Sequence, residues 1–545
     1  MTGKRILAIG IAGLLALSAC SKATTGGASG GGNSWTTPHV LRYATAEDIN
    51  ALNPHLATSL TVNLMAELTM AYLIRWDEHN QPYPELATDV PTQADGGVSK
   101  DGLTITYHIR KGVKWSDGAP FDADDVVFSF GVVLNKANNE VSTTGWDLIS
   151  KIDEPDKHTV VLHMKKKYSP FVETFFSTAG ANPCILPKHL LAKYPNINNV
   201  PYNAKPVGIG PFKYERWDRA QQVVMVPDPL YWRGQPKLQR IIFKIVPDRN
   251  TVLTQMDSHE LDMWWPVPGA FLDRVKAIAG VSILRQPSYV FNHFDFNTQR
   301  PRVRELAVRQ AIRLATDRVR LRDTIGHHVG IIQDVPAPNT APYFDADIKP
   351  TPFDIAAANA LLDKAGWKRG PDGIRTKNGV SLNLDIASST GSPDVDQQIE
   401  LIRGWWKQIG VGMNVQHYPS PLMFAPAQQG GVVYSNKWDM VFFAWGVDAI
   451  GDYSSIYGGS QFPPNGQNDL RWRDPKAQAA IDAVYSHFDQ AQRNRDLRGL
   501  FEAFDADVPS FVTTLREDVW AYNSDLKNFH PNGVSPFDGM MDVDI

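Results

Sequence analysis

The sequence predicts an α/β protein built from more than one domain. The chain has 545 residues, of which 43% are hydrophobic and 21% charged, so it is globular and too long for a single hydrophobic core. In its second half, short apolar strands alternate with amphipathic helices, which is the pattern of an α/β domain. The net charge of −4 disfavours a nucleic-acid binder, because such domains are usually basic.

The N-terminus has the pattern of an export signal. Lys4 and Arg5 precede the apolar stretch 6–19, which is too short to span a membrane. Its end, LSAC, resembles the lipobox of bacterial lipoproteins, which implies cleavage before Cys20 and lipidation of its thiol. The alternative is an ordinary secretory signal with an incidental cysteine. The Gly/Ser-rich residues that follow, up to position 37, predict a flexible tether.

The chain has two cysteines, so lipidation of Cys20 would leave Cys184 unpaired. No histidine or acidic pair lies near Cys184 in the sequence, and we interpret it as a packed small hydrophobe rather than a nucleophile. The hydrophobic core of an exported protein of this size can suffice without a disulfide.

The first half of the chain contains predicted strands and capped helices. Residues 103–110, LTITYHIR, alternate apolar and polar side chains, which predicts a half-buried strand. Asp122 is placed to cap a helix that carries Val126 to Val133. Three further strands and a helix between Asp248 and Met256 are expected, the strands at His158–Met164, Gln222–Val226 and Arg240–Val246.

Residues 301–325 fit one amphipathic helix with Pro301 in its first turn. Its apolar stripe consists of Val308, Ile312, Ala315 and Val319. Acidic residues are interspersed among its arginines, so we interpret the arginines as a solvated face rather than a nucleic-acid surface.

The second half continues the alternation of strands and helices. Helices are expected at 355–365 and 394–408, each followed by a glycine that suits a helix C-terminus. Strands are expected at Ser381–Ala387, Gly412–His417 and Met440–Trp445. The last of these, MVFFAW, lacks a helical period and predicts a strand buried on both faces. Asp448 follows this strand, where a carboxylate needs a cationic or hydrogen-bonding partner.

No enzyme motif in the chain is complete. Gly208 to Pro211 begins like a dinucleotide loop but lacks its third glycine, and His259-Glu260 lacks the second histidine of a zinc protease. His327-His328 would make a poor metal site, because adjacent side chains point in different directions. Ser524 to Lys527 matches the serine–lysine motif of penicillin-binding proteins without its companion motifs. We therefore expect no catalytic residue, no metal site and no cofactor.

Seven stretches of the chain resemble the large solute-binding proteins of bacterial ABC importers, the peptide/nickel-binding family. They are ALNPHLATS (51–59), GLTITYHIRKGVKWSDGAPFDADDVVFSF (102–130), VGIGPFKYERW (207–217), DPLYWRGQPKLQRIIFKIVPD (228–248), SHELDM (258–263), FNTQRPRVRELAVRQAIRLATDR (296–318) and IAAANALLDKAGW (355–367). Their common order over hundreds of residues makes the resemblance specific. It implies an extracytoplasmic receptor that delivers a small ligand to ABC permease subunits and, through them, to ATPase subunits.

The resemblance implies a two-lobed α/β fold of the periplasmic-binding (Venus flytrap) type with an extra α+β subdomain. The expected limits are 1–19 for the signal peptide, 20–37 for the lipidated cysteine and tether, 38–75 with 205–297 and 510–545 for lobe I, 76–204 for the subdomain, and 298–509 for lobe II. A ligand that contacts both lobes would stabilise the closed form, which the permease recognises.

In peptide-binding relatives, a W-x-x-D sequence at the end of a strand lines the cleft, and its aspartate pairs with the α-ammonium group of the peptide. Residues 445–448, WGVD, match this spacing. The resemblance thus implies that Asp448 holds the amino terminus of a ligand and that Trp445 walls a side-chain pocket. Backbone groups at Ala444 and Gly446 would add sheet-like hydrogen bonds. The alternative is that Asp448 caps the turn that follows the strand.

Four further residues are weaker ligand-binding candidates: Asp452, Thr58, Ser59 and Trp146. The alternatives are loop capping for Thr58 and Ser59 and subdomain packing for Trp146. Some relatives carry an arginine before the tryptophan that holds the C-terminus of a peptide, but here Met440 to Ala444 are apolar. Either the C-terminus is left free, or the ligand is not a peptide.

We therefore predict a monomeric, lipid-anchored receptor of the periplasm or cell surface that binds di- or oligopeptides and no nucleic acid. An oligosaccharide, nickel or another metal chelate is the alternative ligand within the same class. An exported hydrolase and a surface chaperone or sensor are the alternatives from other classes.

Overall fold

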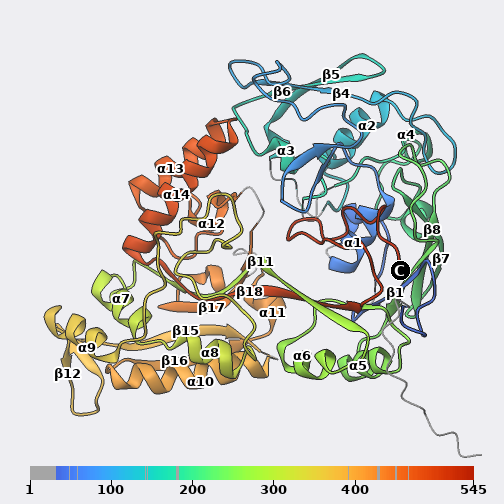
Figure 1. Ribbon diagram of the computed structural model, residues 1–545. Helices are drawn as coiled ribbons and strands as arrows, with labels where there is room; N and C mark the ends of the chain where they lie inside the picture. Colours follow the sequence, from blue (N-terminus) through green and yellow to red (C-terminus); the bar gives the residue numbers. More distant parts are fainter. Residues whose placement is uncertain are drawn as a thin grey trace, which may run out of the picture.

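The computed structural model describes residues 32–47, 49–57, 59–140, 143, 145–179, 183–390, 392–425, 430–447, 451–463 and 466–545. They form two lobes that share a long central sheet, with a smaller α+β unit next to the first lobe (Figure 1). The predicted two-lobed α/β fold with an extra subdomain is confirmed.

In the described part of the chain, ten strands form one sheet that runs through both lobes in the order β16-β15-β17-β11-β18-β10-β1-β9-β8-β7. The lobe I strands are β1 (Val40–Thr45), β7 (Phe212–Asp218), β8 (Gln222–Pro227), β9 (Arg240–Ile245) and β10 (Met263–Trp264). The lobe II strands are β15 (Asn383–Ser389), β16 (Gly412–Tyr418) and β17 (Met440–Gly446). The strands predicted from periodicity in both lobes are present, with ends shifted by up to two residues.

Two long antiparallel strands, β11 (Val281–Phe296) and β18 (Ser510–Asn523), connect the lobes (Figure 1). Their regular pairing runs from Val281 opposite Asn523 to Pro287 opposite Glu517, and it resumes at Phe291 opposite Leu515. Such an irregularity bends a ladder locally. One half of each strand therefore belongs to each lobe, and the predicted limits at 297 and 510 lie at the far ends of these shared strands.

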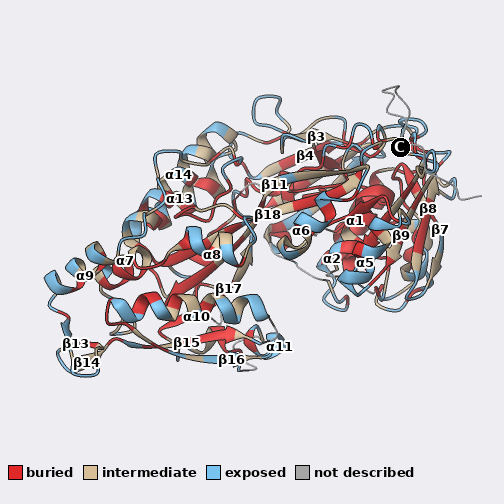
Figure 2. Ribbon diagram, turned by 60° about the horizontal axis from the view of Figure 1, so that its bottom comes forward, coloured by how far each residue is buried: buried red, intermediate tan, exposed pale blue. Residues whose placement is uncertain are grey.

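Helices cover the sheet, with buried inner faces and exposed outer faces (Figure 2). Beneath lobe I lie α5 (Arg249–Asp257) and α6 (Gly269–Lys276), and beneath lobe II lie α8 (Arg318–Thr324) and α10 (Pro393–Gln408). The remaining helices outside the subdomain are α1 (Leu60–Thr69), α7 (Leu306–Leu314), α9 (Ile355–Lys364), α11 (Ser420–Met423), α12 (Ser454–Tyr457), α13 (Pro475–Ser486) and α14 (Gln490–Asp507). Asp248 caps α5, as predicted, by accepting a hydrogen bond from the Thr251 N–H at 2.8 Å.

The single helix predicted over 301–325 is wrong, because two shorter helices occupy this stretch. Helix α7 ends at Leu314, and Asp317 caps α8 by accepting from the Arg320 N–H at 2.9 Å. The solvated-face interpretation also fails for two arginines, Arg309 and Arg318, which are 3% and 2% exposed. Their guanidinium groups donate to backbone carbonyls instead, Arg309 to those of Val303 and Val508 and Arg318 to those of Gln333 and Val512.

The subdomain is built around a three-stranded antiparallel sheet in the order β4-β6-β5. Its strands are β4 (Thr104–His108), β5 (Ile149–Asp156) and β6 (Thr159–Met164), and its helices are α2 (Ala123–Leu134), α3 (Phe171–Thr174) and α4 (Lys188–Leu191). The predicted cap of α2 is confirmed, because Asp122 and Asp125 form a reciprocal capping box. A two-stranded ribbon, β2 (Ile74–Trp76) and β3 (Pro82–Pro84), joins the subdomain to lobe I.

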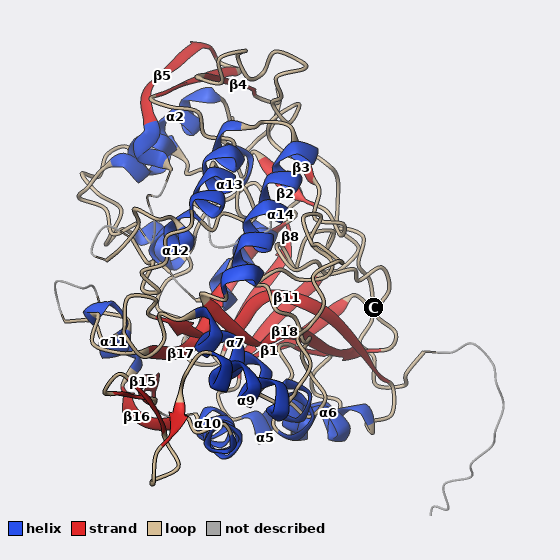
Figure 3. Ribbon diagram, turned by 90° about the vertical axis from the view of Figure 1, so that its left-hand side faces the viewer, coloured by secondary structure: helices blue, strands red, loops and turns tan. Residues whose placement is uncertain are grey.

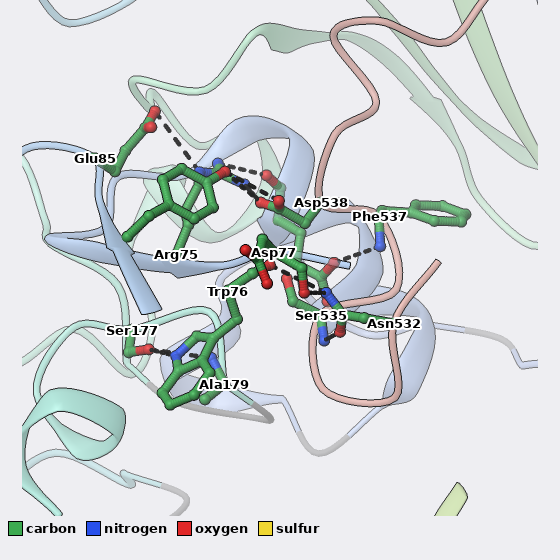
Figure 4. Close-up of polar contacts among 12 residues, drawn as sticks. Arg75, Trp76, Asp77, Glu85, Ser177, Ala179, Asn532, Ser535, Phe537 and Asp538 are labelled. Atoms are coloured by element: carbon green, nitrogen blue, oxygen red, sulfur yellow. Dashed lines mark hydrogen bonds and ion pairs between the residues drawn. The ribbon is translucent and has the colours of Figure 1, made fainter. Parts of the chain in front are cut away.

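A buried charge network fixes this ribbon to the C-terminal segment of lobe I (Figure 4). The Arg75 guanidinium lies 3.6 Å from the Glu85 carboxylate and 3.3 Å from that of Asp538, and it donates to the Glu67 carbonyl at 2.8 Å. The Tyr83 hydroxyl donates to Asp538 at 2.9 Å. Burial raises the pKa of Glu67 to about 8, although its carboxyl accepts from the Phe537 N–H at 2.7 Å.

Residues 33–36, which were predicted to belong to a flexible tether, pack on lobe I. The Trp35 ring stacks on His259 with centroids 4.3 Å apart. The Asn33 side chain donates to the Gly280 carbonyl and to Asn523, while Asp525 accepts from the Asn33 N–H and the Thr36 hydroxyl. An aromatic ring and four hydrogen bonds are enough to order this short stretch.

Candidate functional site

The C-terminal end of β17 presents backbone groups that no described strand pairs. On one side, β17 pairs with β11 as far as Trp445 opposite Phe291 and Gly446 opposite Val290. On the other side, its pairing with β15 ends at Phe442. Burial falls along the same direction, from Met440 to Phe443, which are buried, to Gly446, which is exposed. The strand therefore ends as an accessible edge that can accept an extended partner.

Trp445 stands on this edge with an unused hydrogen-bond donor. Its ring is half-buried and packs edge-on against Phe443 with centroids 5.2 Å apart. It also contacts the apolar cluster of Phe291, Val512 and Leu515, on the strands that connect the lobes. Its indole Nε1 is buried and has no hydrogen-bond partner among the described residues. An unsatisfied donor of this kind is costly, and a bound molecule could accept from it.

Asp452, a weaker candidate from the sequence, is held by the protein itself. Its Oδ1 accepts from the Ser454 N–H at 2.9 Å, and its Oδ2 accepts from the Tyr485 hydroxyl at 2.5 Å. Burial raises the pKa of Tyr485, and the neighbouring Asp452 carboxylate raises it further, so the phenol remains a donor. Asp452 lines a polar hollow of ≈ 1120 Å³ between the subdomain and α12–α13 of lobe II.

The other predicted site residues do not gather at this edge. Trp146 is 1% exposed and packs against Phe130, Phe175 and Phe176 in the subdomain core, so the packing alternative accounts for it. The Ser59 hydroxyl donates to Glu47 at 2.6 Å beside the start of α1. Cys20, Thr58 and Asp448 lie outside the described residues.

Tyr485 and Ser454 were not identified from the sequence. Tyr485 is 33 residues from Asp452 along the chain, and no local motif links them. Tyr168 and Lys167 of the subdomain line the same hollow from the opposite side. An aromatic residue near the end of an amphipathic helix gives no signal that its hydroxyl meets a carboxylate of another segment.

Among the described residues, no group of three or more His, Cys, Asp and Glu side chains is arranged to hold a metal ion. Cys184 is a buried free thiol. No described helix combines the length and the apolar character needed to cross a membrane.

Comparison with known proteins identifies relatives that are binding proteins. Residues 81–466 match the middle region of the bacterial extracellular solute-binding proteins of family 5. The oligopeptide-binding protein AppA of Bacillus subtilis is 23% identical over 447 residues, which cover 81% of this chain and 79% of AppA. The nickel-binding periplasmic protein of Escherichia coli is 27% identical over 415 residues, covering 74% of this chain and 76% of that protein.

The similarity extends to solved structures. The structure of Bacillus subtilis AppA in complex with a nonapeptide superposes with a TM-score of 0.73 at 20% sequence identity. The match covers 92% of this chain and 98% of AppA. At this identity the likeness concerns the fold, and it accounts for both lobes and the subdomain together.

Proposed function

The chain belongs to the bacterial extracellular solute-binding proteins of family 5, and we propose that its ligand is a short peptide captured between the two lobes. The observation that carries this proposal is the open edge of β17 at Ala444 to Gly446. A peptide backbone can extend such an edge by hydrogen bonds that do not depend on its side chains. The relatives include one named for oligopeptide binding, AppA.

Trp445 would contribute in two ways at this edge. Its unpartnered indole N–H can donate to a peptide carbonyl, and its half-buried ring can form one wall of a side-chain pocket. Closure of the lobes would remove the exposed part of the ring from water.

Asp448 stays the predicted partner of a peptide α-ammonium group. It follows Trp445 by three residues, in the W-x-x-D spacing found in peptide-binding relatives. An ion pair at one end of an extended peptide would fix its direction and register on the strand edge.

The remaining roles follow from this reading. The receptor would hand its ligand to permease subunits and make or break no covalent bond itself. It would act as a monomer, anchored by a lipid on Cys20 to a membrane surface outside the cytoplasm.

Native mass spectrometry of protein purified without refolding tests the ligand class. A co-purified peptide mixture would give a ladder of masses above that of the polypeptide. A single additional mass with the isotope pattern of nickel would show that the ligand is a metal chelate and not a peptide, as the name of the nickel-binding relative suggests.

The Asp448→Asn variant tests the role of the carboxylate. It should weaken binding of a free-amine peptide about 100-fold and leave binding of the N-acetylated peptide unchanged, because only the charge is removed. Isothermal titration calorimetry with both peptides measures the difference. Asp354→Asn, at the cap of α9, is the matched control and should bind both peptides as the parent does. Equal losses for the two peptides would make Asp448 a structural residue.

A further inference from the structure

We infer that Tyr485 couples the connection after β17, at Asp452 and Ser454, to a latch between the subdomain and lobe II. The latch consists of Tyr168, Ser169 and Phe171 of the subdomain with Val484, Tyr485 and Phe488 of lobe II. This inference rests on the proposed capture of a ligand between the lobes.

The polar part of the latch is Ser169, which meets the end of α13. The Ser169 N–H donates to the Tyr485 carbonyl at 3.1 Å, and its hydroxyl donates to the Val484 carbonyl at 2.6 Å. These carbonyls lie in the last turn of α13, where a helix leaves its oxygens without internal donors. Ser169 thus caps a helix of the opposite lobe, and water can replace it when the lobes separate.

The apolar part of the latch consists of two ring pairs on either side of Ser169. Tyr168 faces Tyr485 with centroids 5.7 Å apart, and Phe171 faces Phe488 at 6.1 Å. Phe488 also occupies space above Gly102 of the subdomain, where an added Cβ would lie 2.5 Å from its ring. The two surfaces therefore fit closely, and Gly102, with a positive φ, makes room for the ring.

The Tyr485 hydroxyl connects the latch to the chain segment that follows β17. This hydroxyl donates to Asp452 and lies 2.6 Å from the Ser454 hydroxyl. Asp452 follows Trp445 by seven residues in the connection that leaves β17. A ligand that shifts this connection would shift Tyr485, and the same residue carries a carbonyl that Ser169 holds.

Figures 1 and 3 show why this contact reports on closure. Helices α13 and α14 extend from lobe II to the subdomain, and β11 and β18 run between the two lobes. The pairing irregularity after Pro287 lies in those strands, so a bend there would open the latch while leaving both lobes intact. Tyr485 is therefore a positioning residue, which acts through Asp452 on the connection that leaves β17.

Hydrogen–deuterium exchange of the full chain tests the inference at the Ser169 amide. In the parent protein, a saturating pool of synthetic tripeptides should slow exchange of this amide about tenfold, because the closed form becomes dominant. Tyr485→Phe keeps the ring and removes the link to Asp452, so the peptides should still bind but slow exchange less than about threefold. Ser150→Ala is the control, because its hydroxyl bond to His163 lies within the subdomain.

A second arm does not depend on the ligand. Without peptides, Tyr485→Ala should speed exchange of the Ser169 amide about tenfold relative to the parent, while amides of the subdomain sheet keep their rates. The inference is overturned if this rate is unchanged, or if peptides bind to the parent, as followed by tryptophan fluorescence, without slowing it. If the pool does not bind at all, the peptide proposal fails while the ligand-free arm still decides the latch.

Discussion

The subdomain touches both lobes, but the two contacts differ in kind. Towards lobe I, ions are buried: Arg75 and Glu85 are 4% and 2% exposed, and they join Asp538 and the Tyr231 hydroxyl. Towards lobe II, the latch consists of two hydrogen bonds from Ser169 and two ring pairs, and beside it the buried Glu173 of the subdomain attracts Arg493 of α14. Separating buried ions leaves uncompensated charges, whereas water can replace neutral hydrogen bonds. Because the buried network towards lobe I holds more charges, the subdomain should part more readily from lobe II than from lobe I.

The largest expected effect is the loss of the buried network. Arg75→Met should lower the free energy of unfolding by about 3–5 kcal/mol, because it leaves Asp538 buried without a cation and Glu85 with only the partly exposed Arg233. Urea unfolding of parent and variant measures this difference. Arg216→Met, which removes an exposed pair with Asp218, is the control and should cost no more than about 0.5 kcal/mol. A similar small cost for Arg75→Met would show that the two contacts of the subdomain do not differ as described.

The next effect is a pH dependence centred on Glu67. Because burial raises its pKa to about 8, the stabilisation from the neutral carboxyl is complete below its ordinary value and is lost as the pH rises through 8. Between pH 6 and pH 8 the parent should lose about 2 kcal/mol of stability through this group, at no more than 1.36 kcal/mol per pH unit. Glu67→Gln should abolish that loss, which melting temperatures at both pH values measure. A parent melting temperature that is flat over this range would contradict the prediction.

The smallest effect is expected at the lobe II contact. Ser169→Ala removes one hydroxyl hydrogen bond and should lower the free energy of unfolding by about 1 kcal/mol or less. Thermal unfolding beside Ser150→Ala, which removes an exposed hydroxyl hydrogen bond inside the subdomain, compares the two sites. A loss near that of Arg75→Met would make the latch a permanent interface.

Local patterns predicted the elements better than their partners. Six apolar residues identified β17, and an aspartate with acidic neighbours identified the start of α2, because both signals depend on residues next to each other. The break between α7 and α8 also had a local cause, the cap at Asp317, which the continuous apolar stripe concealed. Arg309 looked solvated because its own helix does not reveal the carbonyls of Asp507 and Val508 that it meets.

The candidate site was predictable only along β17. Trp445, Gly446 and Ala444 were proposed from one contiguous motif and its resemblance to relatives. Tyr485 contacts Asp452 from helix α13, and Ser169 meets Val484 across 315 positions of the chain. Periodicity tells which face of an element is buried, but it does not tell which other element covers that face. Contacts between residues so far apart in the sequence are therefore seen only in the folded structure.

The docked segment at Asn33 to Thr36 determines how this molecule would respond to a pull on its N-terminus. Trp35 on His259 and the bonds to Asp525 and Asn523 fasten that segment to lobe I, just beyond the end of β18. A force on the preceding chain would therefore act on lobe I and on the subdomain attached to it. The force would not be applied to lobe II directly, so lobe II could still open and close relative to lobe I.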